Sequence, residues 1–207
     1  MGRARMQDDL TEPDAATLAT RRTTSGSAAS RAVGRLILRG MGWRIEGSPP
    51  DVPKAVMIGA PHTSNWDLLL ALGVRLSLGL PLSWMMKREA FWWPMGPVWR
   101  SLGGIPVDRR DARALPRQMA RWFGSVDQGW LGIAPEGTRE SVTRYKRGYL
   151  HIAKAAGVPV IIVGVDAPRK TVVFDRVWQP GPDINADNAA IRDYIRARYS
   201  GMIASRN

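Results

Sequence analysis

Residues 54–67 read KAVMIGAPHTSNWD, which combines a short apolar run, a turn and the start of a helix. Lys54–Ala60 has the length and apolar content of a buried strand, and Pro61–Asn65 has the composition of a turn. Residues 68–80 are apolar on nearly all sides, and Ser64 is a typical helix N-cap. We therefore expect a strand that leads through a histidine-containing turn into a buried helix.

The buried helix expected over residues 68–80 is too short to cross a membrane. It carries Arg75, and its length is well below the about 20 apolar residues that a transmembrane helix needs. We favour burial inside the protein over insertion into a membrane, and we predict no transmembrane span.

Apolar runs of strand length alternate with helical patterns on both sides of this stretch. This alternation predicts an α/β fold: a single domain with a mixed, largely parallel sheet flanked by helices. The helix nearest the N-terminus should place Val33, Leu36 and Ile37 on one side, opposite its arginines. Further strands are expected at residues 82–86, 104–107, 130–134, 158–165 and 171–174, and further helices at 31–39, 112–126, 146–156 and 185–199.

Charge and composition limit the classes of partner. Residues 1–30 contain four arginines, four acidic residues and no aromatics, so we expect a disordered tail followed by one domain over residues 31–207. The formal net charge of +12 in 207 residues therefore belongs to the domain. Such a surplus indicates nucleic acid, anionic lipid or a phosphorylated substrate. The chain has no cysteine, which excludes disulfides, thiolate metal sites and cysteine nucleophiles.

The histidine of the turn, His62, precedes Asp67 by five residues. If the helix begins near Asn65, Asp67 lies in its first turn and can contact the imidazole. A carboxylate on one ring nitrogen leaves the other available as a general base. The alternative is that His62 packs in the turn and Asp67 stabilises the helix N-terminus. His151, the other histidine, lies in a helical pattern with no acidic residue within four positions, and we expect it to be structural.

A second motif is WLGIAPEGTR at residues 130–139, an apolar strand that ends in Glu136, Gly137, Thr138 and Arg139. Loops at the carboxyl ends of strands line the ligand crevice of α/β sheets. An arginine there can bind a phosphate through two hydrogen bonds, and a glycine allows the backbone to approach the ligand. The alternative is a surface turn with an ion pair between Glu136 and Arg139.

The stretch LGGIPVDR at residues 102–109 repeats this design, because a short apolar strand ends in Asp108 and Arg109. Two strands that end in an acid and an arginine, together with one that ends in His62 and Asp67, could converge on one pocket. That pocket would hold a base and phosphate-binding cations.

An aromatic segment, KREAFWWPMGPVWR, occupies residues 87–100. Its rings, flanked by basic residues, suit a membrane interface, where they lie at headgroup depth and cations meet lipid phosphates. Burial in the core is the competing interpretation. The candidate membrane contacts are Phe91, Trp92, Trp93 and Trp99.

Four motifs together indicate a family. The HX4D pattern of His62 and Asp67, GGIPVDR at 103–109, EGTR at 136–139 and VPVII at 158–162 occur in the order and approximate spacing of the four blocks of glycerolipid acyltransferases. The chain resembles the 1-acylglycerol-3-phosphate (lysophosphatidate) acyltransferase family, in particular its compact bacterial members. The resemblance implies a glycerol-3-phosphate acyltransferase-like fold.

The resemblance also implies a reaction. His62 would take the proton from a glycerol hydroxyl, Asp67 would orient it, and the oxygen would attack the thioester of acyl-CoA or acyl carrier protein. No acyl-enzyme is needed, in agreement with the absence of cysteine and of a Gly-x-Ser-x-Gly turn. The acceptor and its phosphate would be bound by Arg109, Glu136, Gly137, Thr138, Arg139 and Lys146, and residues 158–162 would border the acyl channel.

The partners follow from the same resemblance. We expect a lipid acceptor, an acyl-CoA or acyl carrier protein donor, and peripheral attachment to the cytoplasmic face of the plasma membrane. We expect neither a metal nor a bound cofactor, because the thioester is a co-substrate.

Two other classes of function remain as alternatives. An acyl thioesterase or other hydrolase is the nearest, since a His–Asp pair can activate water as well as an alcohol. A basic nucleic-acid-binding protein is less favoured, because the sequence has no helix-turn-helix, zinc or RNP pattern.

Overall fold

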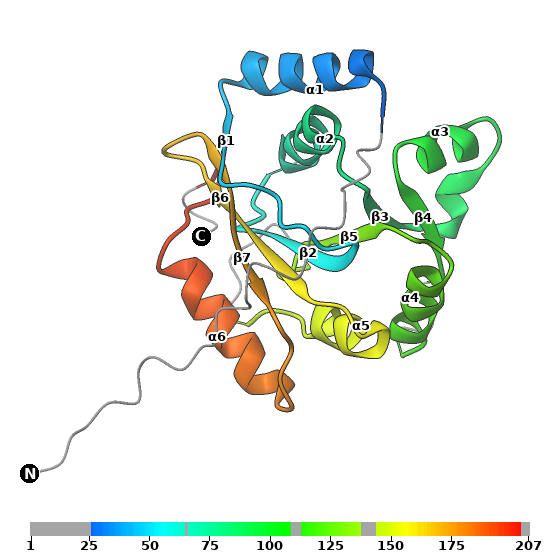
Figure 1. Cartoon of the computed structure of the whole chain (residues 1–207), viewed down its shortest axis with the longest axis vertical. Helices are drawn as coiled ribbons and strands as arrows, with labels where there is room; N and C mark the ends of the chain where they lie inside the picture. The colour runs from blue at the N-terminus through cyan, green and yellow to red at the C-terminus, as the bar shows by residue number, and fades with distance from the viewer. Residues whose placement is uncertain (1–25, 65, 109–112, 138–143, 204–207) are drawn as a thin grey trace, which may run out of the picture.

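A mixed sheet of seven strands, with helices on both faces, forms the core of the computed structural model (Figure 1). The structure describes residues 26–64, 66–108, 113–137 and 144–203. In chain order the elements are α1 Ala28–Met41, β1 Arg44–Glu46, β2 Lys54–Ala60, α2 Trp66–Leu78, β3 Leu82–Lys87, the 3₁₀ helix η1 Arg88–Phe91, α3 Met95–Ser101, β4 Gly104–Val107, α4 Leu115–Gly124, β5 Gly129–Ile133, α5 Gly148–Ala156, β6 Val160–Asp166, β7 Thr171–Trp178 and α6 Ile184–Arg196.

The strand order is β1-β7-β6-β2-β5-β3-β4. Strands β6, β2, β5, β3 and β4 are parallel neighbours, whereas β7 pairs antiparallel with β6 and β1 pairs parallel with β7. The carboxyl ends of five strands therefore meet at one edge of the sheet. This result confirms the predicted mixed, largely parallel sheet.

The two faces of the sheet have separate apolar cores. One core joins α1 and α2 to the sheet through residues such as Leu38, Leu70 and Val74. The other core joins α4, α5 and α6 through residues such as Phe123 and Leu150. Strand β6 is buried along its whole length, and its sequence is apolar from residue 160 to residue 165, as expected for a strand covered on both faces.

Helix α1 lies against α2 through glycines, and this contact corrects one prediction. A Cβ atom on Gly34 would lie 2.2 Å from the backbone nitrogen of Ser77, and one on Gly73 would lie 3.0 Å from Ile37. Because the backbones approach so closely, the buried side of α1 is centred on Gly34 and Leu38. Val33 and Leu36, expected on the packed side with Ile37, are 50% and 71% exposed.

Some element boundaries also differ from those expected. Helix α1 begins at Ala28, with Ser27 as its N-cap, so it includes the last residues of the expected tail; the tail's residues 1–25 lie outside the described residues. Strand β1 and helix α3 were not predicted from the sequence. Both are short, and α3 contains glycine and proline, which disfavour a helical prediction.

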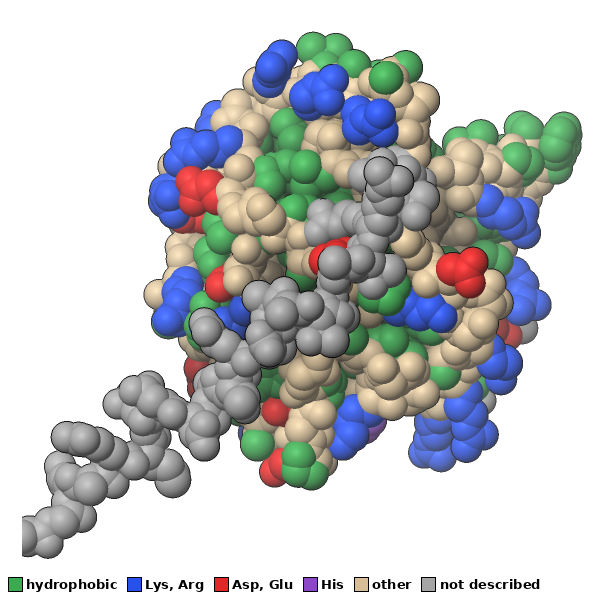
Figure 2. Space-filling model, in the orientation of Figure 1, with side chains coloured by type: hydrophobic (Ala, Val, Ile, Leu, Met, Phe, Trp, Pro, Cys, Tyr) green, Lys and Arg blue, Asp and Glu red, His purple; other side chains and the backbone are tan. Residues whose placement is uncertain are grey.

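The aromatic segment forms η1, α3 and their connection at the edge of the sheet beside β4 (Figure 1). Trp92 and Trp93 are 61% and 82% exposed. Phe91 and Trp99 are half-buried, and a Cβ on Gly104 would lie 3.2 Å from the Phe91 ring. Figure 2 shows hydrophobic side chains at the tip that projects beside α3, with Lys and Arg side chains below it along the same edge of the molecule.

Within residues 26–64, 66–108, 113–137 and 144–203, no helix is both long and apolar enough to cross a bilayer.

Candidate active site

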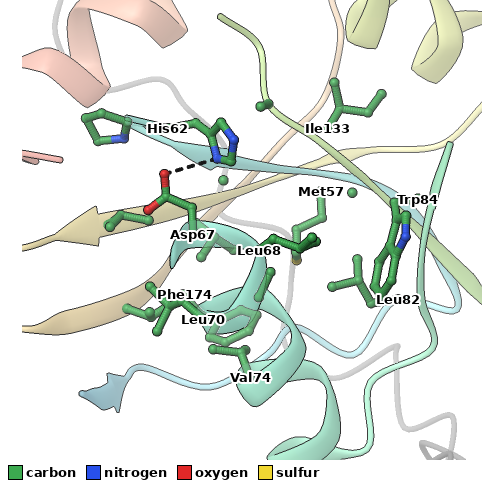
Figure 3. A pocket seen from close by; sticks show the side chains of 18 residues that line it. Met57, His62, Asp67, Leu68, Leu70, Val74, Leu82, Trp84, Ile133 and Phe174 are labelled. Carbon is green, nitrogen blue, oxygen red and sulfur yellow. Dashed lines mark ion pairs between the residues drawn. The ribbon is translucent and has the colours of Figure 1, made fainter. Parts of the chain in front are cut away.

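His62 and Asp67 face each other at the junction of β2 and α2 (Figure 3). The Nδ1 atom of His62 lies 3.3 Å from Oδ2 of Asp67. The same Oδ2 accepts hydrogen bonds of 2.8 Å from the backbone N–H groups of Thr63 and Ser64. Asp67 is only 6% exposed. The turn that follows β2 therefore holds the carboxylate in place, and the carboxylate in turn orients the imidazole.

This arrangement determines which ring nitrogen can act as a base. When Nδ1 of His62 carries the proton and donates it toward Asp67, Nε2 is the nitrogen that can accept another. The negative charge of Asp67 then stabilises the imidazolium that forms. The imidazole is 29% exposed, so it is accessible from solvent.

Glu136 connects the second motif to the same turn. It follows β5, and its Oε1 accepts a 3.2 Å hydrogen bond from the backbone N–H of His62. Its side chain is buried, and Oε2 has no hydrogen-bond partner among the described residues. Burial, reinforced by the charge of Asp67, raises the pKa of Glu136 from 4.5 to about 7. Glu136 is therefore partly protonated near neutral pH.

The shifted pKa of Glu136 leads to a stability prediction. Between about pH 4.5 and 7 the folded protein retains a proton that the unfolded chain loses, so the free energy of unfolding falls as pH rises through this window. Glutamine at position 136 does not titrate, so Glu136→Gln should not lose stability in this way. The free energy of unfolding of the variant minus that of wild type should therefore increase by about 2–3 kcal/mol from pH 4.5 to pH 8. Urea unfolding across this range measures the difference, and parallel pH profiles would contradict the assigned shift.

An apolar cavity of about 260 Å³ lies between α2 and the sheet, with His62 and Asp67 at one end (Figure 3). These two residues are the only ionisable ones that line it, within the part of the chain that the structure describes. The other walls come from α2 and from strands β2, β3, β5, β6 and β7. They include Leu70, Val74, Leu82, Trp84, Val163 and Phe174.

Strand β6 borders this cavity, although not through the residues of the expected motif. Val163 and Val165 line the cavity, whereas residues 158–162 do not. Val160 and Ile162 point into the core on the other face, beside α5. Because alternate residues of a strand face opposite sides, only one side of β6 can reach the cavity.

A second cavity, of about 770 Å³, is lined by residues of β3, β5, α4, α5 and the loops beside them. Its basic side chains are Arg113, Lys146 and His151. The Nζ atom of Lys146 lies 3.4 Å from the carbonyl oxygen of Gly137, whose φ of +64° favours glycine. The cavity thus brings Gly137 and Lys146 of the predicted acceptor site together.

Other predicted residues have different outcomes. Arg109, Thr138 and Arg139 lie outside the described residues. His151, expected to be structural, is exposed and lines the second cavity, so core packing does not explain it. Arg113 was not singled out from the sequence, because it lies outside the four motifs.

Comparisons with known proteins agree with this fold. A sequence model of the acyltransferase family matches residues 46–166. The 1-acyl-sn-glycerol-3-phosphate acyltransferase of Haemophilus influenzae is 26% identical over 148 residues, which cover 67% of this chain and 58% of that protein. The protein of the same name from Escherichia coli is 27% identical over 124 residues, covering 57% and 49% of the two chains. The chain therefore spans about half the length of these curated relatives.

The fold also resembles a solved structure. The 1-acyl-sn-glycerophosphate acyltransferase PlsC of Thermotoga maritima has a TM-score of 0.58 and 20% sequence identity, with 84% of this chain and 80% of that one covered. The shared fold agrees with the resemblance drawn from the four motifs, and the family model covers more than half of the sequence. The chain belongs to the acyltransferase family.

Proposed function

We propose that the protein transfers a fatty acyl group from acyl-CoA or acyl carrier protein to a hydroxyl of a lysophospholipid, with 1-acylglycerol-3-phosphate as the favoured acceptor. The observation that carries this proposal is the His62–Asp67 pair at the end of an apolar cavity. A His–Asp pair and an apolar space lie side by side, and this arrangement supports direct transfer.

The reaction needs one proton acceptor. Nε2 of His62 takes the proton of the acceptor hydroxyl while the oxygen attacks the thioester carbonyl. A carbon–oxygen bond forms, the carbon–sulfur bond breaks, and the imidazolium returns its proton to the leaving thiolate. Asp67 stabilises the imidazolium throughout. Neither an acyl-enzyme nor a bound cofactor takes part, because the acyl group passes directly from the thioester sulfur to the hydroxyl oxygen of the acceptor.

The apolar cavity is suited to a fatty acyl chain. Leu70, Val74, Leu82 and Phe174 surround it, and each methylene that leaves water contributes about 0.8 kcal/mol. The ionisable groups are confined to one end, which is where the carbonyl of the acyl group has to lie.

The acceptor phosphate is assigned to the cationic side of the site. Lys146 and Gly137 lie together there, next to Glu136. By resemblance to the family, Arg109, Thr138 and Arg139 complete this set. The proposal for these three residues rests on the motifs alone.

Acyl transfer can be tested directly. Labelled acyl-CoA or acyl carrier protein is incubated with 1-acylglycerol-3-phosphate, glycerol 3-phosphate or monoacylglycerol, and the lipids are analysed by mass. We expect a diacyl product with 1-acylglycerol-3-phosphate, formed with release of the free thiol. Equal loss of the thioester without any acceptor, with free fatty acid as the product, would identify a hydrolase instead.

We also propose peripheral attachment to the cytoplasmic face of the plasma membrane, through Trp92 and Trp93. Both rings are exposed in a segment that also carries the exposed basic residues Arg88 and Arg100, and a lipid acceptor has to be drawn from a bilayer. Phe91 and Trp99, which are half-buried, hold this segment in place rather than contacting lipid.

The double variant Trp92→Ser/Trp93→Ser is expected to bind vesicles containing anionic lipid about tenfold or more weakly, because two exposed indoles no longer enter the interface. Flotation with vesicles of phosphatidylglycerol and phosphatidylcholine measures the bound fraction. Val177→Ser, at another exposed apolar position, is the matched control and should float like wild type. Equal flotation of the double variant and the control would exclude these tryptophans from the membrane contact.

A further inference from the structure

The second cavity has a chemistry unlike that of the first. Arg113 precedes α4, Lys146 precedes α5, and His151 lies within α5, so three separate positions bring basic side chains to one space of about 770 Å³. Among the described residues that line it, none is acidic. Its remaining walls are apolar or glycine. A cavity lined in this way favours an anion.

The backbone adds to this preference. Helix α5 begins at Gly148, which lines the cavity, and no side chain among the described residues caps its N-terminus. The positive end of the helix dipole and the first backbone N–H groups are therefore close to the basic side chains. Gly137 lies beside Lys146, and its lack of a side chain allows the backbone to approach a ligand closely.

The second cavity adjoins the site of acyl transfer. Trp84, Gly132, Ile133 and Ala134 line both cavities. The end of β5 and Trp84 therefore form the wall between a group bound in the second cavity and the apolar cavity. A phosphorylated substrate can place its phosphate on one side while its reacting atoms lie near His62.

We propose that Arg113 and His151 bind the phosphate group of a substrate in the second cavity, together with Lys146. Neither Arg113 nor His151 belongs to the four motifs of the family, so this site extends the acceptor site assigned by resemblance. The inference rests on the proposed function for the identity of the substrate. The phosphate comes from one of two sources, the glycerol phosphate of the acceptor or the phosphorylated carrier of the acyl donor.

Direct binding tests the site without requiring catalysis. The probes are glycerol 3-phosphate for the acceptor and free coenzyme A for the donor, titrated calorimetrically into the full chain. Arg113→Gln and His151→Gln should each weaken binding of one probe about tenfold, as expected for loss of a charge-assisted hydrogen bond. Arg117→Gln is the matched control, because Arg117 is exposed on α4 but does not line the cavity.

Kinetics identify the source of the phosphate. A rise in KM for 1-acylglycerol-3-phosphate, with kcat and the donor KM retained, assigns the site to the acceptor. A rise in the donor KM alone assigns it to the carrier. If both variants bind both probes as Arg117→Gln does, while all three variants melt at the wild-type temperature, the inference is wrong. A different outcome would be that the variants bind the probes more weakly while the wild type transfers no acyl group. That outcome would reject the proposed function but support the phosphate site.

Discussion

Replacement of His62 by alanine is expected to lower kcat by about 10²- to 10⁴-fold, because the proposed reaction then has no general base. The KM values should change little, since the apolar walls of the acyl cavity and the cationic residues of the second cavity are untouched. The imidazole is partly exposed, so the variant should fold normally. Steady-state transfer assays and a thermal melt measure the two effects.

Chemical rescue makes the His62 prediction specific. Alanine removes the ring at the end of the cavity, and added imidazole can then take its place beside Asp67. We expect imidazole to restore part of the lost activity in His62→Ala and to have no effect on wild type. A near-normal kcat in the unrescued variant would mean that another group takes the proton.

Asp67 should have two separable roles, and two variants distinguish them. In Asp67→Asn the side-chain oxygen can still accept the N–H groups of Thr63 and Ser64, but the charge that stabilises the imidazolium is gone. We expect kcat to fall by about 10²-fold or more. Because the amide nitrogen would replace Oδ1, which is buried without a hydrogen-bond partner among the described residues, we expect a loss of stability of about 1–3 kcal/mol.

Asp67→Ala removes the backbone hydrogen bonds as well. Two N–H groups in a buried turn lose their acceptor, at a cost of about 1–3 kcal/mol each, so this variant should be clearly less stable than Asp67→Asn. Urea unfolding gives the two free energies. Equal destabilisation by asparagine and alanine would show that the hydrogen bonds to the turn contribute little.

The sequence predicts the sheet well because its strands are short apolar runs with clear ends. Lys54–Ala60 and Gly104–Val107 have the expected boundaries, and the alternation of strands with helices led to the correct fold class. The proximity of His62 to Asp67 was also foreseen, since it depends on a turn of a few residues and on the start of one helix.

Features that depend on tertiary contacts were not predictable from the pattern. The apolar residues Val33 and Leu36 suggested the packed side of α1, but the absence of side chains at Gly34 and Gly73 decides which side can approach α2. The periodicity of a sequence depends on which residues are apolar, so it does not show where a glycine allows two helices to approach closely.

The exposed position of His151 was also not predicted from the sequence. Its neighbours in the sequence are apolar and include no acid, and that surrounding suggested a packed helix. Both His151 and Ile152 line the second cavity, but Ile152 is buried whereas His151 is exposed. One signal was available: His151 follows Gly148 by three residues, so both lie on the same face of the helix near its N-terminus.

The wall between the two cavities determines how substitutions would alter the two binding spaces. A side chain at position 132 of β5 would point toward Leu82 in the acyl cavity, whereas Ile133 packs against the core that includes α4 and α5. Both positions nevertheless line both cavities, because the end of β5 belongs to the wall that the cavities share. Under the proposed function, a substitution at either residue would therefore alter the space for the acyl chain and the space beside the phosphate site together.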